Sequence, residues 1–234
     1  MSTNKIALIL LTRNELPCLK VVFPTIPKPS PEAGFDEIYA VDGGSTDGTV
    51  EFFKEHGIPV ISQSKRGRGE AFLQAFDAIK ADAFVFFSPD GNEDIKDLPK
   101  FKERLNQGAD VVIASRMMKG AWNEEDHLTF KWRKWANNAF NIMANMFFRK
   151  TKPFITDSIN GYRAISKKAA DVLKLDAYDY TIEYQMTIRA FKNKLNIVEF
   201  PTHEGERVAG ETGAPSFQTG IKFIKRFFTE LFAH

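Results

Sequence analysis

The chain has 234 residues, with 32 Lys and Arg against 30 Asp and Glu and a formal net charge of +2. A balance this close to neutral provides no field for general nucleic-acid binding, so nucleic acid is excluded as a partner. Hydrophobic residues make up 43% of the chain and aromatic residues 13%, which is enough for a sizeable core and argues against disorder. The length suits one α/β domain.

The chain contains a single cysteine, Cys18, which cannot form an internal disulfide and fits a reducing compartment. The apolar run at 6–11 is too short for a signal peptide. No stretch approaches the ~20 apolar residues that span a bilayer. We therefore expect a cytoplasmic protein that does not cross a membrane.

Short β-rich runs alternate with helical patterns along the first half of the chain. The expected strands are residues 6–11, 37–41, 60–62, 83–87 and 110–115, and the expected helices are residues 47–56, 69–81 and 98–106. This order predicts an α/β fold with a mostly parallel central sheet flanked by helices.

The alternation loosens after residue 115. The patterns there predict a long helix at 130–148, an extended or turn segment at 157–165, a helix at 177–193 and a last strand at 195–201. Residues 216–232 place apolar side chains at helical spacing and basic ones opposite, which predicts an amphipathic C-terminal helix. We expect one domain over residues 1–215, with residues 216–234 packed on it or on the membrane surface.

Polar and glycine-rich segments follow each of the first five expected strands. They are residues 12–15, 42–49, 65–69, 88–94 and 115–116. Each alone is explained by a helix cap, a tight turn or a solvated loop. Ligands of parallel α/β sheets bind beyond the carboxyl ends of the strands, so five such segments at one edge indicate a binding site.

These segments supply the groups that a nucleotide-diphosphate ligand requires. Asp42 can accept hydrogen bonds from a base or a ribose, and Asp90 offers a hard oxygen ligand for Mg²⁺ or Mn²⁺. Arg66, Arg68 and Arg116 can offset the diphosphate charge. The glycines match neither the dinucleotide-binding nor the P-loop pattern, which disfavours an oxidoreductase or a P-loop enzyme.

The chain resembles the family 2 glycosyltransferases in seven segments that occur in the family's order. They are Thr-Arg-Asn-Glu (12–15), Val-Asp-Gly-Gly-Ser-Thr-Asp-Gly-Thr (41–49), Arg-Gly-Arg-Gly (66–69), Ser-Pro-Asp-Gly (88–91), Ala-Ser-Arg (114–116), Asp-Ser-Ile-Asn-Gly-Tyr-Arg (157–163) and Glu-Arg-Val-Ala-Gly-Glu (206–211). The most similar branch is the dolichyl-phosphate mannosyltransferase-like, or polyprenyl-phosphate glycosyltransferase, group.

This resemblance implies a GT-A fold, an inverting mechanism, a nucleotide-sugar donor and a divalent metal, Mg²⁺ or Mn²⁺. The roles it implies fall on matching positions: nucleotide binding on Leu11, Arg13, Glu15, Asp42 and Gly69, metal binding on Asp90 and Asn92, and acceptor binding on Arg133, Asn137 and Arg207. Arg116 is implied at the diphosphate.

The chain departs from the family pattern at three positions. Ser88 stands where the family usually has the first Asp of its Asp-x-Asp metal motif, and Gly43 replaces the second Asp of the common Asp-Asp-Gly-Ser. Gly213 replaces the final Lys of a C-terminal motif of the polyprenyl-phosphate branch. The first change affects the metal site and the last affects the choice between a lipid-phosphate and a saccharide acceptor.

The acceptor decides whether catalysis needs a base. A phosphate monoester, with a second pKa near ~6, is largely ionised at neutral pH, whereas a sugar hydroxyl requires a carboxylate base. Asp157 is the favoured candidate, because it opens the motif before Gly161; Glu124, Glu125 and Glu183 are the alternatives.

Four functions therefore stay open. The first is transfer of a sugar to a polyprenyl- or dolichyl-phosphate acceptor, with peripheral contact at the cytoplasmic face of the membrane. The second is the same chemistry onto a saccharide, and the third is a nucleotide-sugar binding protein without catalysis. The last, a sugar-phosphate nucleotidyltransferase, is disfavoured because residues 12–15 are not the glycine- and lysine-rich loop of that class.

Overall fold

In the computed structural model, residues 5–150, 153–209 and 216–233 are described. A single seven-stranded sheet runs through the molecule in the order β3-β2-β1-β4-β6-β5-β7. Its strands are β1 (Ile6–Thr12), β2 (Glu37–Asp42), β3 (Val60–Ser62), β4 (Ala83–Phe87), β5 (Val111–Ser115), β6 (Arg163–Ser166) and β7 (Ile197–Pro201). All pairs are parallel except those of β6, which runs antiparallel to β4 and β5. The mostly parallel sheet predicted from the sequence is confirmed.

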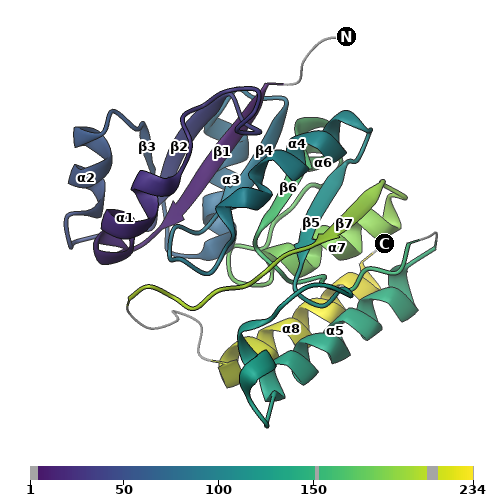
Figure 1. Ribbon diagram of the computed structural model, residues 1–234. Helices are drawn as coiled ribbons and strands as arrows, with labels where there is room; N and C mark the ends of the chain where they lie inside the picture. Colours follow the sequence, from purple (N-terminus) through teal and green to yellow (C-terminus); the bar gives the residue numbers. More distant parts are fainter. Residues whose placement is uncertain (1–4, 151–152, 210–215, 234) are drawn as a thin grey trace.

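Helices cover both faces of this sheet and make a three-layer molecule (Figure 1). One face packs against α1 (Leu16–Val22), α2 (Thr49–Glu55) and α4 (Leu98–Asn106). The other packs against α3 (Arg68–Ala78), α5 (Trp132–Phe148), α6 (Lys167–Leu173), α7 (Ile182–Lys192) and α8 (Ser216–Phe232). Three short 3₁₀ helices, η1 (Phe23–Thr25), η2 (Ile95–Asp97) and η3 (Glu124–His127), lie in the connections.

The central strands alternate their side chains between the two layers. In β1, Ile6, Leu8 and Leu10 pack on the α1–α2–α4 side, and Ala7, Ile9 and Leu11 pack on the other side. The strand is therefore buried along its whole length, as expected for a parallel strand that is covered on both faces.

The helix predicted at 177–193 begins later than expected, at Ile182. The preceding residues are used to complete α3. The carbonyls of Tyr178 and Asp179 accept hydrogen bonds from the amides of Glu70 and Gly69, both at 3.1 Å. These amides belong to the first turn of α3 and have no partner within that helix.

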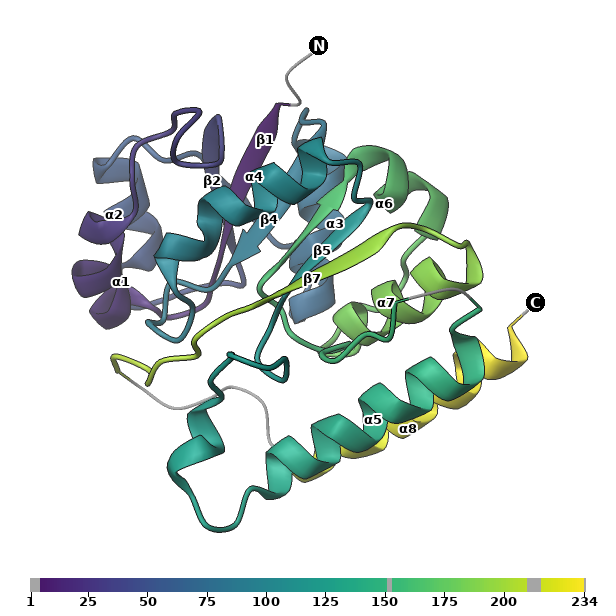
Figure 2. The ribbon, with the colours of Figure 1, turned by 45° about the vertical axis from the view of Figure 1, so that its right-hand side comes forward.

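The two longest helices, α5 and α8, lie side by side below the sheet (Figure 2). Their contact includes edge-on aromatic pairs of Phe227 with Phe147 and Phe148, at centroid distances of 5.2 and 5.5 Å. No helix within the described residues combines the length and apolarity needed to span a bilayer.

Candidate functional site

The carboxyl ends of β1, β2, β4, β5 and β7 meet at one edge of the sheet. Because β6 runs in the opposite direction, the loop before it also arrives at this edge, and it carries Asp157 and Gly161. Two adjoining cavities lie here, of about 550 and 520 Å³.

The first cavity lies beyond β1 and β2. It is lined by Leu11, Arg13 and Glu15, three of the residues expected at the nucleotide, and by the backbone-exposing Gly43. Its charged lining consists of five basic side chains and two acidic ones: Arg13, Arg66, Arg68, Arg207 and Lys222 against Glu15 and Asp179. This cavity therefore suits an anionic ligand.

Two other residues expected at the nucleotide, Asp42 and Gly69, do not line the first cavity. Asp42 is 2% exposed, and its carboxylate accepts hydrogen bonds from the amides of Gly44 and Ser45 and from the hydroxyls of Thr12 and Ser45. It thereby holds the turn after β2. Gly69 lies against the backbone of the segment that precedes α7. A Cβ at this position would stand 2.0 Å from the carbonyl oxygen of Ala177.

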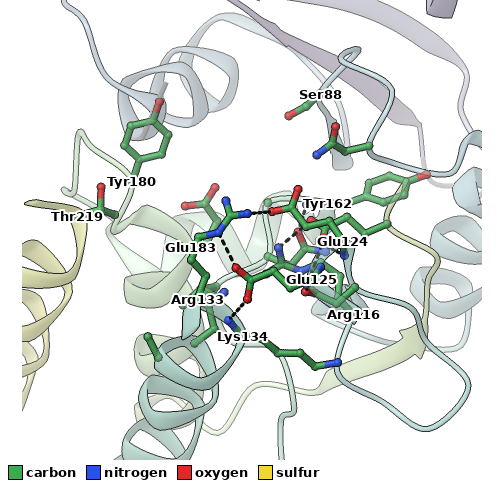
Figure 3. Close-up of a pocket in the computed structure, with 18 of the residues that line it drawn as sticks. Ser88, Arg116, Glu124, Glu125, Arg133, Lys134, Tyr162, Tyr180, Glu183 and Thr219 are labelled. Carbon is green, nitrogen blue, oxygen red and sulfur yellow. Dashed lines mark hydrogen bonds and ion pairs between the residues drawn. The ribbon is translucent and has the colours of Figure 1, made fainter. Parts of the chain in front are cut away.

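The second cavity lies beyond β4 and β5, beside the loop that precedes β6, and against α5 and α8 (Figure 3). All the residues expected at the metal and the acceptor line it, together with Arg116: Asp90, Asn92, Arg133, Asn137 and Arg207. Apolar Phe140 of α5 and Phe223 of α8 complete one wall. This cavity thus combines a charged side with an apolar side.

Four residues, Arg68, Ser88, Tyr180 and Arg207, line both cavities. Arg207 joins them electrostatically: its guanidinium donates to Glu15 Oε1 at 2.5 Å and to Asp90 Oδ2 at 2.8 Å. Burial raises the pKa of Asp90 and of Glu15, and the charge of Arg207 offsets only part of that effect. The two carboxylates are therefore poorly solvated and in need of positive charge.

Asp157, the favoured base candidate, is fully buried and does not face either cavity within the described residues. Its carboxylate accepts from Arg116 three times, from Nε at 2.8 Å and from Nη2 and the backbone amide at 3.1 Å. Burial lowers the pKa of Arg116, but the charges of Asp157 and Glu204 outweigh it and hold that pKa well above its ordinary value. The geometry makes Asp157 a residue that orients Arg116.

The other base candidates are also paired. Glu183 binds Arg68 closely, and Glu125 accepts from Arg133 Nε and from the Lys134 amide, both at 2.8 Å. Among the described residues Glu124 has one ion pair, with Arg133 at 2.9 Å (Figure 3), and its side chain is a third exposed. Glu124 is therefore the most accessible of the candidate carboxylates.

Glu204 was missed by the sequence reasoning. It follows β7, and its Oε1 accepts from Arg116 Nη1 at 2.9 Å while its Oε2 accepts from Asn123 Nδ2 at 2.8 Å. The only available signal was an acidic residue shortly after a strand end. Within the described residues, no three His, Cys, Asp or Glu side chains converge as a metal site.

Solved structures share this architecture. The glucosyl-3-phosphoglycerate synthase from Mycobacterium tuberculosis, in complex with Mn²⁺ and UDP-glucose, superposes with a TM-score of 0.73 over 97% of this chain and 79% of that chain, at 19% identity. The expected GT-A-like fold is thereby confirmed. The family model "Glycosyl transferase family 2" matches residues 8–171, and the chain belongs to this family.

Curated relatives cover much of the chain. The dolichol-phosphate mannosyltransferase of Pyrococcus furiosus is 27% identical over 213 residues, 89% of this chain and 58% of that protein. The polyprenol monophosphomannose synthase of Mycolicibacterium smegmatis is 27% identical over 222 residues, 89% of this chain and 80% of that protein. The chain spans only 54% of the length of a third relative, the glycosyltransferase AglJ of Haloferax volcanii.

Proposed function

We propose that this protein transfers a sugar from a nucleotide-diphosphate sugar to a polyprenyl-phosphate acceptor at the cytoplasmic face of a membrane, with a divalent metal. The pair of adjoining cavities carries the proposal, because one has an excess of basic groups and the other combines charged groups of both signs with apolar side chains of α5 and α8. Two relatives are named for lipid-phosphate products or acceptors, which supports the same reading.

The donor belongs in the first cavity. Leu11, Arg13 and Glu15 lie around its base and ribose, and Asp42 acts by fixing the turn that begins at Gly43, a residue that lines this space. The diphosphate then extends toward the wall shared with the second cavity, where Arg68 and Arg207 stand. Guanidinium groups suit this task because they bind phosphate oxygens with two parallel N–H donors.

The residues at Asp90 fit a divalent metal. Asp90 offers carboxylate oxygen, and the side-chain oxygen of Asn92 is buried without a hydrogen-bond partner in the described part of the chain. Oxygen donors of this kind are the ligands of Mg²⁺ and Mn²⁺. The metal, when bound, neutralises charge that develops on the leaving diphosphate. Arg207, now paired with Asp90, is then free to bind phosphate.

The acceptor phosphate belongs in the second cavity, among Arg116, Arg133 and Asn137. Arg116 is held in place by Asp157 and Glu204, so its guanidinium is oriented before the ligand arrives. A phosphate nucleophile is already ionised at neutral pH, which agrees with the buried, fully paired state of Asp157. It attacks the anomeric carbon opposite the diphosphate and inverts its configuration.

The lipid part of the acceptor has a matching surface. Beside the cavity, α5 exposes Trp135, Ile142 and Met146, and α8 exposes Ile221, Ile224 and Phe228, each set at helical spacing. Exposed apolar groups on this scale mark an interaction surface. The exposed Lys225, Arg149 and Lys150 provide positive charge near these stripes for anionic lipid headgroups.

Thermal shift with UDP-, GDP- and dTDP-sugars, each with and without Mn²⁺, tests the donor. We expect one nucleotide to raise the melting temperature only with metal, and Asp90→Ala to abolish that rise while the free protein stays folded. Equal stabilisation with and without metal, in both proteins, would contradict the metal role.

Product analysis with two acceptors tests the reaction. Detergent-dispersed polyprenyl phosphate should be glycosylated, and free saccharides should not. Turnover with saccharides alone would replace the lipid acceptor, and donor binding without turnover on any acceptor would indicate a binding protein.

Vesicle sedimentation tests the surface. Phe228→Glu should lose binding to anionic vesicles while keeping donor binding, whereas Val172→Glu, at a similarly exposed apolar position on α6, should bind like the wild type. Equal vesicle binding by both variants would contradict the membrane role of α8.

A further inference from the structure

The side chain of Glu93 folds back onto the backbone of Ser88, the residue that stands where the family pattern has an aspartate. The loop after β4 reverses at Gly91, whose φ of 98° lies in the left-handed region that favours glycine. Glu93 thereby folds back over the start of the loop, and its Oε2 accepts a hydrogen bond from the Ser88 amide at 2.7 Å. Residue 88 itself offers a hydroxyl, which Arg68 contacts at 3.4 Å.

The Glu93 carboxylate lines the second cavity beside Asp90 and Asn92. The neighbouring guanidinium groups have nearer partners elsewhere, since Arg68 pairs with Glu183 and Arg207 with Asp90 and Glu15. Among the described residues Glu93 therefore has no ion pair of its own, whereas Asp90 is paired with Arg207.

The second cavity as a whole also has more acidic than basic side chains, which favours a bound cation. Six carboxylates line it, against five basic side chains: Asp90, Glu93, Glu124, Glu125, Glu183 and Glu204 against Arg68, Arg116, Arg133, Lys134 and Arg207. Asp157 adds a further negative charge directly behind Arg116. Next to Glu93, the side-chain oxygen of Asn92 is buried without a hydrogen-bond partner in the described residues and offers an uncharged oxygen ligand.

We propose that Glu93 is the second carboxylate ligand of the divalent cation, with Asp90 and the side-chain oxygen of Asn92, and that it replaces the aspartate missing at position 88. This inference rests on the proposed metal-dependent function. Three oxygen ligands from the protein would leave coordination positions for the diphosphate of the nucleotide sugar and for water. Mg²⁺ favours such a set of ligands in phosphate-bearing sites.

A purely structural role for Glu93, as a brace for the Ser88 amide, predicts different behaviour. In Glu93→Gln the side-chain oxygen can still accept that hydrogen bond, so the loop is kept and only the charge is lost. Asp94→Asn is the matched control: Asp94 caps η2 by accepting from the Lys96 amide at 3.0 Å, and an asparagine oxygen can do the same.

Mn²⁺ is titrated into each purified protein, alone and with UDP or GDP, and the free ion is followed by electron paramagnetic resonance. We expect Glu93→Gln to weaken Mn²⁺ binding by at least about tenfold and Asp94→Asn to leave it unchanged. The double variant Ser88→Asp/Glu93→Gln should recover most of the lost affinity, because it restores a carboxylate at the same place. Melting temperatures establish that each variant is folded.

The outcomes separate this inference from the proposed function. If the wild type binds Mn²⁺ and Glu93→Gln binds it equally well, Glu93 is not a ligand and only the inference fails. If Glu93→Gln binds weakly but Ser88→Asp brings no recovery, Glu93 acts through the loop and the inference also fails. If the wild type binds no Mn²⁺ under any of the three conditions, metal-dependent transfer fails with it.

Discussion

Replacing Asp157 with asparagine tests whether this residue orients Arg116 or acts as a base. The carboxylate is fully buried and receives three hydrogen bonds from Arg116. Asparagine keeps the shape but removes the charge and turns an N–H donor toward a guanidinium that can only donate. Breaking one partner of a buried ion pair costs about 3–5 kcal/mol, because the other charge stays buried without compensation.

Urea unfolding measures this loss. With a dependence of about 2–3 kcal/mol per molar urea, the midpoint of Asp157→Asn should fall by about 1–2.5 M. Asp171→Asn removes one partner of the exposed pair with Lys167 and should change stability by less than about 1 kcal/mol. In the double variant Asp157→Leu/Arg116→Met both charges are gone, so part of the stability should return.

Kinetics complete the test. If Asp157 orients Arg116, Asp157→Asn should weaken phosphate binding and leave the pH profile of the remaining activity unchanged. A midpoint equal to that of the Asp171 control would refute the orienting role. Loss of the acidic limb of the profile, with stability intact, would restore Asp157 as a base.

Two further predictions concern packing and pH. Gly69→Ala places a Cβ against the backbone oxygen of Ala177 and should lower the free energy of unfolding by about 1–3 kcal/mol, whereas Gly220→Ala, with open space around it on α8, should be neutral or slightly stabilising. Urea midpoints compare the two, and equal values would contradict the close approach. Burial raises the pKa of Glu199 to about 7, despite the amides of Thr156 and Asp157 that lower it. Its stabilising contribution is complete below its ordinary pKa and is lost as the pH rises through about 7. Melting temperatures of Glu199→Gln should therefore fall less than those of the wild type between about pH 5 and pH 8, and parallel curves would contradict this assignment.

Helices and strands were predictable from the sequence where an apolar pattern ends at a polar break. The strands Val60–Ser62 and Ala83–Phe87 and the helix Leu98–Asn106 have the predicted bounds, because apolar runs and polar breaks coincide at their ends. The helices Leu16–Val22 and Lys167–Leu173 were not predicted. Each has only seven residues, too few to show a helical period.

The pairing of β6 was not predictable from its own four residues. It lies between two strands that precede it in the chain, and its direction is set by those partners. The same limit applies to the site. The sequence predicted Asp157, Arg116 and Asp90 as site residues. The ion pairs of Arg116 with Asp157 and of Arg207 with Asp90 could not be predicted, because they join segments that are distant in the chain. The roles of these residues in catalysis and binding stay predictions.

The wall between the two cavities has a thermodynamic consequence. Arg68, Ser88, Tyr180 and Arg207 face both spaces, so a molecule on either side displaces or fixes the same side chains. If the proposed donor and acceptor occupy these two cavities, we expect that they do not bind independently. Whatever factor the acceptor contributes to the affinity of the donor, the donor contributes to that of the acceptor, since the coupling free energy is reciprocal. A dissociation constant measured for either ligand alone would then differ from its value when the other ligand is bound.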